Sequence, residues 1–241
     1  MNTIDFISES HLGDCIIHAD FLNKLIKVNK NLGVNFYVIE THKNQVDEFI
    51  ENKDQIKTFN RSEAPSTAVR AWMAQYGHIK IIPFDFGLLK LNFYNRLCQE
   101  LQVKCPYNNI IDLLPDSNLF YENPKDQKWD ILLINSDGHS GQTNGLPLDC
   151  NLFVERFKHK QIITTKKYKN IPCTIDLNYS VMDIGRLSLK CDLIIGVHTA
   201  PWHTVMNRKN YDANKKFFHM DVNNFYSYKN CTTITSLEQL I

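Results

Sequence analysis

Short apolar runs alternate along this chain with longer stretches whose apolar residues recur every three or four positions. The short runs are typical of strands, and the longer spacing is typical of helices. We predict strands at residues 3–7, 34–39, 56–59, 79–82, 129–134, 161–165, 173–177, 193–197 and 217–222. We predict helices at residues 15–26, 46–51, 66–76, 88–101, 147–157, 180–189 and 236–241, and a short one through residues 203–206. Strands separated by helices indicate βαβ units and therefore parallel sheets.

The alternation is interrupted once, at about residues 108–128. This segment contains Pro115, Pro124 and several Asn and Asp residues, a composition typical of a linker. We therefore predict an α/β protein with two Rossmann-like domains, residues 1–115 and residues 125–241, each built on its own parallel sheet.

Composition narrows the class of protein. The 241 residues include 27 Lys and Arg against 26 Asp and Glu, so the net charge of +1 gives no argument for a nucleic-acid partner. No segment approaches the ~18 uninterrupted apolar residues of a membrane span, and the first ten residues do not resemble a signal peptide. The seven cysteines form no Cys-x-x-Cys pair, which indicates reduced thiols in a cytoplasmic protein rather than disulfides or a zinc site.

The first candidate for chemistry is the segment His11-Leu12-Gly13-Asp14, which follows the first predicted strand. Ligands of open α/β sheets bind beyond the carboxyl ends of the strands. Gly13 would let the backbone approach a ligand closely, and the Asp14 carboxylate could take a proton from a hydroxyl group. The alternative is that Asp14 only caps the helix and complements its dipole.

The second candidate is the predicted strand at residues 193–197 together with the segment that follows it, up to His203. Small residues and a helix start after the strand would present backbone N–H groups to a phosphate. Thr199 could donate its hydroxyl, and His203 lies about one helical turn further on. The alternative is an ordinary strand-to-helix turn with Pro201 at the first helical position.

The third candidate is the loop at residues 135–145, which contains three glycines, Ser136 and other polar side chains. It matches neither a P-loop nor a dinucleotide-binding glycine pattern. The alternative is a solvated surface loop.

Together these segments resemble heptosyltransferase-like family 9 glycosyltransferases. That family has a Gly-Asp pair at the start of its first helix, which matches Gly13 and Asp14. It also has a strand ending in Ile-Gly-Val-Asp-Ser/Thr-Gly-Pro-x-His. Residues 195–203 match this motif, with His198 in place of Asp and Ala200 in place of Gly.

The resemblance implies the GT-B architecture, in which two Rossmann-like domains face a cleft. It implies a nucleotide-diphosphate-sugar donor on the C-terminal domain, a glycan or lipid-linked glycan acceptor on the N-terminal domain, and no obligatory metal or cofactor. Asp14 would be the general base. The predicted nucleotide-sugar-binding residues are Gly13, Ser136, Gly196, His198, Thr199, Ala200, Pro201 and His203.

Two classes of function fit these residues. The first is an inverting glycosyltransferase. The second is a non-catalytic protein of the same fold that binds a nucleotide-sugar or a sugar phosphate. Another GT-B enzyme, such as a sugar-nucleotide epimerase, is a third hypothesis, since Rossmann-like sheets support many functions.

Overall fold

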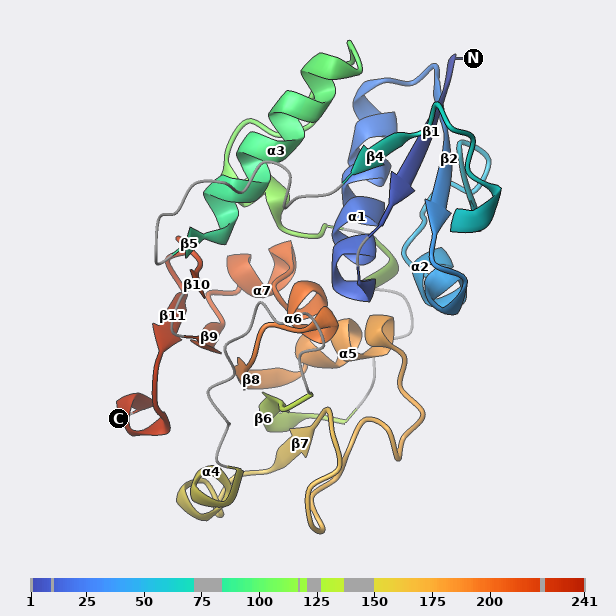
Figure 1. Cartoon of the computed structure of the whole chain (residues 1–241). Coiled ribbons are helices and arrows are strands. Elements are labelled where there is room, and N and C mark those ends of the chain that lie inside the picture. Colours follow the sequence, from blue (N-terminus) through green and yellow to red (C-terminus); the bar gives the residue numbers. More distant parts are fainter. Residues whose placement is uncertain are drawn as a thin grey trace. The chain divides into compact units, whose positions relative to one another are not determined.

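Every ladder between the strands that the structure describes is parallel, apart from isolated bridges, as the alternation of strands and helices predicted. The structure is a computed structural model that describes residues 2–9, 11–71, 84–116, 118–120, 127–136, 150–221 and 224–240 (Figure 1). The chain forms two compact units. The first comprises Met1–Lys80 and Gly87–Leu119, and the second comprises Ile81–Phe86 and Phe120–Ile241.

The first unit contains a four-stranded parallel sheet in the order β3-β2-β1-β4. Its strands are β1 (Asn2–Ser8), β2 (Leu32–Val38), β3 (Ile56–Asn60) and β4 (Val69–Ala71). Its α-helices are α1 (Leu12–Val28), α2 (Lys43–Asp47) and α3 (Phe86–Glu100), and short 3-10 helices span Glu40–His42, Arg61–Glu63, Ile110–Leu113 and Asn118–Phe120. The stripe predicted for α1 is confirmed, because Cys15, Ala19, Leu22 and Ile26 are all buried.

The helix predicted at residues 66–76 is wrong where the structure shows β4. Val69 and Ala71 pair in parallel with Phe6 and Ser8 of β1, and this long-range ladder overrides the local helical pattern. The strand predicted at residues 79–82 lies outside the described residues. The helix predicted at residues 46–51 is mostly wrong, because α2 spans Lys43–Asp47 and overlaps the predicted range only at residues 46 and 47.

The second unit contains a five-stranded parallel sheet in the order β11-β9-β8-β6-β7. Its strands are β6 (Trp129–Ile134), β7 (Ile162–Thr164), β8 (Cys191–Gly196), β9 (Lys216–Met220) and β11 (Cys231–Ile234), with a separate short pair β5 (Phe84–Asp85) and β10 (Asn224–Phe225). Its helices are α4 (Cys150–Arg156), α5 (Val181–Ser188), α6 (Ala200–Val205), α7 (Arg208–Asp212) and a 3-10 helix at Leu237–Leu240.

Two further predictions for this unit need correction. Residues 174–178 form turns rather than a strand, because Leu177 donates its N–H to the Cys173 carbonyl and only an isolated bridge joins Cys173 to Thr164. The chain also enters the sheet a last time as β11, which was not predicted, before the 3-10 helix that replaces the predicted helix at residues 236–241. The capping box predicted at the start of α5 is confirmed, with Ser180 and Asp183 as partners.

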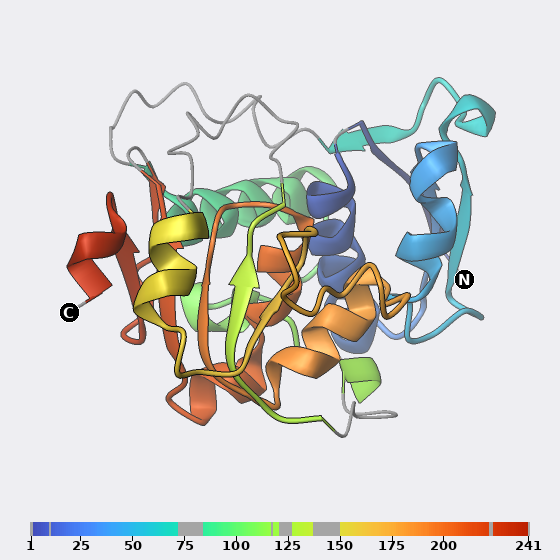
Figure 2. The same ribbon diagram turned by 90° about the horizontal axis from the view of Figure 1, so that it is seen from below.

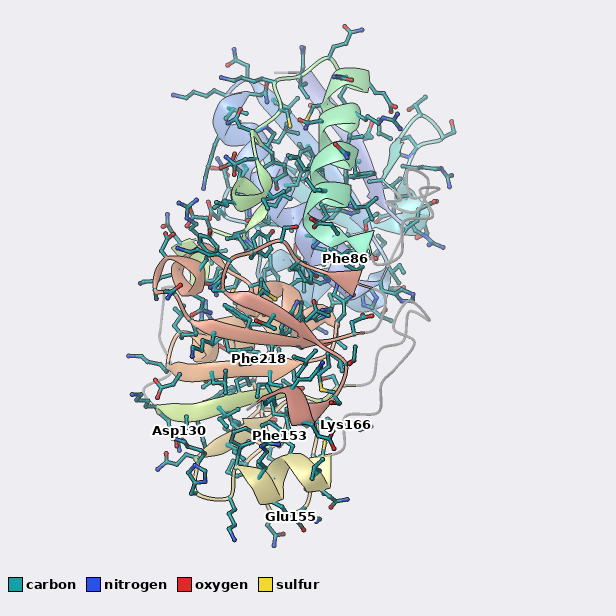
Figure 3. The ribbon with its side chains drawn as sticks, turned by 90° about the vertical axis from the view of Figure 1, so that its left-hand side faces the viewer. Phe86, Asp130, Phe153, Glu155, Lys166 and Phe218 are labelled. Atoms are coloured by element: carbon teal, nitrogen blue, oxygen red, sulfur yellow. The ribbon has the colours of Figure 1, made fainter. Side chains whose placement is uncertain are left out.

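The helices of the second unit lie on both faces of its sheet. Helix α4 covers one face, and α5 and α6 cover the other (Figures 1 and 2). Figure 3 shows Phe153 of α4 pointing toward the sheet and Glu155 of the same helix pointing away from it. Phe153 is buried in a core cluster with Ile131, Leu133 and Ile195 of the sheet, whereas Glu155 is exposed. This arrangement encloses β6 and β8, which explains why both are apolar apart from Asp130 and Asp192 near their starts.

Candidate functional site

The order of strands in the second sheet marks a place where a ligand could bind. After β6 the chain crosses to β7 on one side, whereas β8 and β9 lie on the other side. A switch point of this kind opens a crevice beyond the carboxyl ends of the two central strands. Ser136 follows β6 closely, and His198 and Thr199 follow β8 closely. Since Ile134 pairs with Gly196, the structure brings these predicted residues to the same edge of the sheet.

Gly196 is required by packing within the sheet. A Cβ atom on Gly196 would lie 2.6 Å from the carbonyl oxygen of Ile134, closer than real Cβ atoms approach backbone. The glycine therefore lets β6 and β8 approach at the switch point, whatever its relation to a ligand.

We expect Gly196→Ala to lower the free energy of unfolding of the second unit by about 1–3 kcal/mol, because the added methyl group must displace a backbone strand. Urea denaturation followed by tryptophan fluorescence measures this, since Trp129 and Trp202 are both buried in the second unit. A change below about 0.5 kcal/mol, the range of neutral surface substitutions, would contradict the packing argument.

Thr199 has a hydroxyl group suited to a ligand. It occupies the N-cap position of α6, yet its side chain does not cap the helix. Its Oγ1 is buried and finds no hydrogen-bond partner among the described residues. A buried polar group left in this state costs about 1–3 kcal/mol, so a ligand oxygen beside it would be stabilising. Ala200 and Pro201 form the first turn of α6 directly after it.

His198 and His203 belong to a buried group of aromatic rings. The centroid of the His198 ring lies 4.5 Å from that of Phe86, 4.7 Å from that of His203 and 5.8 Å from that of His219. These ring contacts fix the orientation of the His198 ring at the end of β8. Among the described residues, no group of three or more His, Cys, Asp or Glu side chains is arranged to hold a metal ion.

Ser136 belongs to a polar network that joins the carboxyl ends of β6 and β7. The hydroxyl oxygens of Ser136 and Thr165 lie 2.7 Å apart, and Thr165 Oγ1 also accepts the backbone N–H of Asn135 at 3.1 Å. Asn135 in turn accepts the N–H of Lys166 at 2.7 Å. Sequence reasoning missed Thr165, which only the pairing of β6 with β7 brings to this edge. Most of the predicted loop, from residue 137 onward, lies outside the described residues.

The first sheet has a switch point of its own. The chain passes from β1 to β2 on one side, and β4 lies on the other side. Helix α1 begins at Leu12, so Gly13 and Asp14 lie in its first turn, directly beyond the carboxyl end of β1. The Asp14 side chain is partly exposed.

The alternative role of Asp14 as the helix cap is corrected by the structure. The N-cap residue is His11, which has the extended backbone that this position requires, and Asp14 is the third residue of the helix. The carboxylate is placed to complement the helix dipole, which stabilises by about 0.3–1 kcal/mol.

A buried hydrogen-bonded group lies behind Asp14. The Cys15 thiol donates to Ser8 Oγ at 3.3 Å, and His18 Nδ1 lies 3.0 Å from the same oxygen. All three side chains are fully buried. Burial raises the pKa of Cys15 to about 12, and burial together with the charge of Lys90 lowers the pKa of His18 to about 3. A neutral thiol and imidazole without access to solvent have a structural role, so this group is not a nucleophilic centre.

Lys90 is a residue near Asp14 that sequence reasoning missed. It lies on the buried face of α3, and burial lowers its pKa to about 8 while the charges of Asp14 and Asp20 oppose that shift. The signal was present in the sequence, because Lys90 falls at helical spacing between Gly87 and Tyr94, both of which are buried. A lysine within the apolar stripe of a helix is rarely buried unless a carboxylate lies close to it, so this pattern indicates a nearby carboxylate.

Comparison with known proteins gives a result for the structure but none for the sequence. No protein-family model matches the chain, and no curated protein matches it.

None of the described helices is both long enough and apolar enough to cross a membrane.

Several solved structures resemble the chain along nearly its whole length. A family 9 glycosyltransferase from Veillonella parvula DSM 2008 has a TM-score of 0.53 and 11% identity, covering 99% of this chain and 87% of its own. The E. coli heptosyltransferase WaaC with ADP has a TM-score of 0.57 and 9% identity, and the match covers 99% of this chain and 96% of the WaaC chain. The same enzyme with ADP-2-deoxy-2-fluoro heptose has a TM-score of 0.54 and 8% identity, covering 96% and 92%.

At such low identity the likeness establishes the fold. The predicted α/β class with two Rossmann-like parallel sheets is confirmed. The chain therefore has the GT-B fold of the family 9 glycosyltransferases and heptosyltransferases that its sequence motifs resemble.

Proposed function

We propose that this chain is a glycosyltransferase that moves a sugar from a nucleotide-diphosphate-sugar to a hydroxyl acceptor. The observation that supports this most is the structural likeness to transferases over nearly the whole chain. E. coli WaaC was solved with ADP and with an ADP-heptose analogue, which favours a nucleotide-diphosphate donor here. Because these similar structures are all transferases, the likeness also favours a transferase over a non-catalytic binding protein or an epimerase.

In this proposal the residues of the second unit bind the donor diphosphate. The buried Thr199 hydroxyl donates to a phosphate oxygen, and the first turn of α6 at Ala200 presents backbone N–H groups to the same anion. His203 lies on that helix and its ring contacts His198, so the two histidines fit the leaving-group side of the site. Residues 125–241 would thus form the donor domain, and residues 1–115 the acceptor domain.

Asp14 is the proposed general base. Its carboxylate takes the proton of the acceptor hydroxyl, whose oxygen attacks the anomeric carbon of the donor in line. The bond from that carbon to the diphosphate breaks, and the electron pair leaves with the diphosphate, which Thr199 and the α6 backbone stabilise. A single displacement of this kind inverts the configuration at the anomeric carbon. None of the seven cysteines, all of which the structure describes, forms a disulfide, and this fits a cytoplasmic location, where nucleotide-sugars would be met.

A panel of nucleotide-sugars tests the function directly. A donor at about a hundred times its dissociation constant should add about 2.7 kcal/mol of stability, detected as a rise in melting temperature. An enzyme should also release nucleoside diphosphate from the same donor when an acceptor is supplied. Stabilisation without release would support the binding-protein hypothesis, and the lack of both would overturn the proposal.

We expect Thr199→Val to weaken binding of the nucleoside diphosphate by about 1–3 kcal/mol, the cost of a lost hydrogen bond to a charged group. The unliganded protein should lose no stability, because the hydroxyl that is removed has no described partner. Thr232→Val on β11 is the matched control, since this side chain is exposed and far along the sheet order. Calorimetric titration gives both affinities, and equal values for the two variants would exclude Thr199 from the site.

A further inference from the structure

Five lysines surround one open pocket of the second unit. The pocket has a volume of about 870 Å³, and the lysines that line it are Lys128, Lys190, Lys209, Lys215 and Lys216. Asp192 is the only acidic residue among the described residues that line it. The whole chain is nearly neutral, with a net charge of +1, so this local excess of positive charge is not a consequence of composition. Such a concave cluster of one sign attracts ligands of the opposite sign.

The lysine pocket lies at the opposite edge of the sheet from Thr199. Cys191 and Asp192 at the start of β8 line the pocket, whereas the motif with Thr199 follows the last residue of the same strand. A six-residue strand spans about 20 Å at about 3.3 Å per residue. Lys216 at the start of β9 and Lys128, which precedes β6, belong to the same edge. The pocket is therefore distinct from the proposed donor site.

Partial burial in this pocket disfavours the charged form of the Lys215 ammonium group. Its side chain is partly buried, and its Nζ donates to the backbone carbonyl of Ser188 at 2.5 Å. Burial lowers the pKa of Lys215 to about 8, the thiol of Cys191 and the carboxylate of Asp192 oppose that shift, and Lys128 adds to it. A bound anion would stabilise the charged ammonium group and relieve the repulsion between lysines.

Lys190 and Lys216 leave positive charge available at the rim of the pocket. Lys128 Nζ lies 3.3 Å from Asp192 Oδ1, and both side chains are well exposed. This ion pair partly neutralises the charge of Lys128. Within the described part of the chain, no ion pair involves Lys190 or Lys216, and both side chains are exposed. Ammonium groups of this kind bind phosphate oxygens as mobile point charges.

We propose that the lysine pocket is a second ligand site, which binds the phosphate groups of an anionic molecule. A volume of about 870 Å³ accommodates a phosphorylated ligand. Two sources provide this chemistry, a soluble phosphate compound or the head group of an anionic lipid. This site is additional to the proposed glycosyl transfer and does not depend on it.

Pyrophosphate titrated into the whole protein at low salt tests the site. The variant Lys190→Gln/Lys216→Gln removes two exposed charges from the pocket and should bind about tenfold more weakly, the effect of losing about one charged hydrogen bond. The matched control is Lys158→Gln/Lys160→Gln, which removes two exposed charges elsewhere in the same unit. Since neither pair alters Thr199, binding of pyrophosphate at the proposed donor site cannot produce a difference between them.

Vesicles distinguish the two sources of phosphate. Sedimentation with phosphatidylcholine vesicles that contain phosphatidic acid, compared with pure phosphatidylcholine, measures binding to lipid head groups. Binding of either pyrophosphate or the anionic vesicles that is weakened in the pocket variant, by about tenfold for pyrophosphate, and kept in the control supports the site and identifies its source. The proposal is overturned if neither probe binds the wild-type protein, or if the pocket and control variants bind equally well.

Discussion

Replacing Asp14 by Asn should leave the fold and donor binding intact and should lower sugar transfer by about 10²–10⁴-fold, the usual contribution of a positioned base. The amide has nearly the same shape as the carboxylate but cannot accept the proton of the acceptor hydroxyl. Asp14 lies in the first turn of α1 beyond the carboxyl end of β1, the position at which open α/β sheets place their chemistry. The measurement is the release of nucleoside diphosphate at saturating donor and acceptor.

Stability separates catalysis from a structural role for Asp14. Because His11 and not Asp14 occupies the N-cap, Asp14→Asn and Asp14→Ala should not uncap the helix. Each should lose the interaction with the helix dipole, about 0.3–1 kcal/mol, together with the attraction of the carboxylate to Lys90. Asp54→Asn is the matched control, since this carboxylate is exposed in a turn of the same unit. Transfer by Asp14→Asn at the wild-type rate would show that the base lies elsewhere. His11 would then be tested first, because it adjoins the same helix start and an imidazole can act as a general base.

The first unit should lose stability as the pH falls below about 6.5, at about 1.4 kcal/mol per pH unit, because of His18. The imidazole is fully buried, and its pKa is lowered to about 3 by burial and by the charge of Lys90. Below pH 6.5 the unfolded chain binds a proton on this histidine and the folded chain does not, so protons favour unfolding. Between pH 6.5 and 4.5 the loss attributable to His18 should reach about 2.3 kcal/mol.

Two measurements isolate the contribution of His18. Urea denaturation followed by circular dichroism compares the wild type with His18→Gln, which cannot titrate, and with His159→Gln, which changes an exposed histidine of the second unit. Asp20 acts in the opposite direction, since burial raises its pKa, but it is present in all three proteins. If His18→Gln does not fold, an NMR titration of the wild-type imidazoles replaces it. A His18 resonance that titrates near pH 6.5 would refute the argument.

Local pattern in the sequence determined those elements whose own side chains specify them. The helical stripe of α1, the apolar strands β6 and β8, and the Ser180–Asp183 capping box were all predicted, because each depends on residues within a few positions of one another. The two short motifs at Gly13-Asp14 and at residues 195–203 also suffice to place Asp14 and Thr199 after strands. That placement follows from the order strand, turn, helix, without knowledge of the partners of either strand.

Tertiary structure alone decided what depends on distant neighbours. Residues 69–71 form a strand rather than a helix because β1 pairs with them, and Gly196 is required because Ile134 of the adjacent strand leaves no room for a Cβ atom. Asp14 is a first-turn residue and not a cap because His11 adopts the extended backbone. The lysine pocket is assembled from the starts of three strands that are far apart in the chain. No local periodicity reports such groupings, since a parallel sheet joins segments through long crossovers and brings their ends together only when it forms.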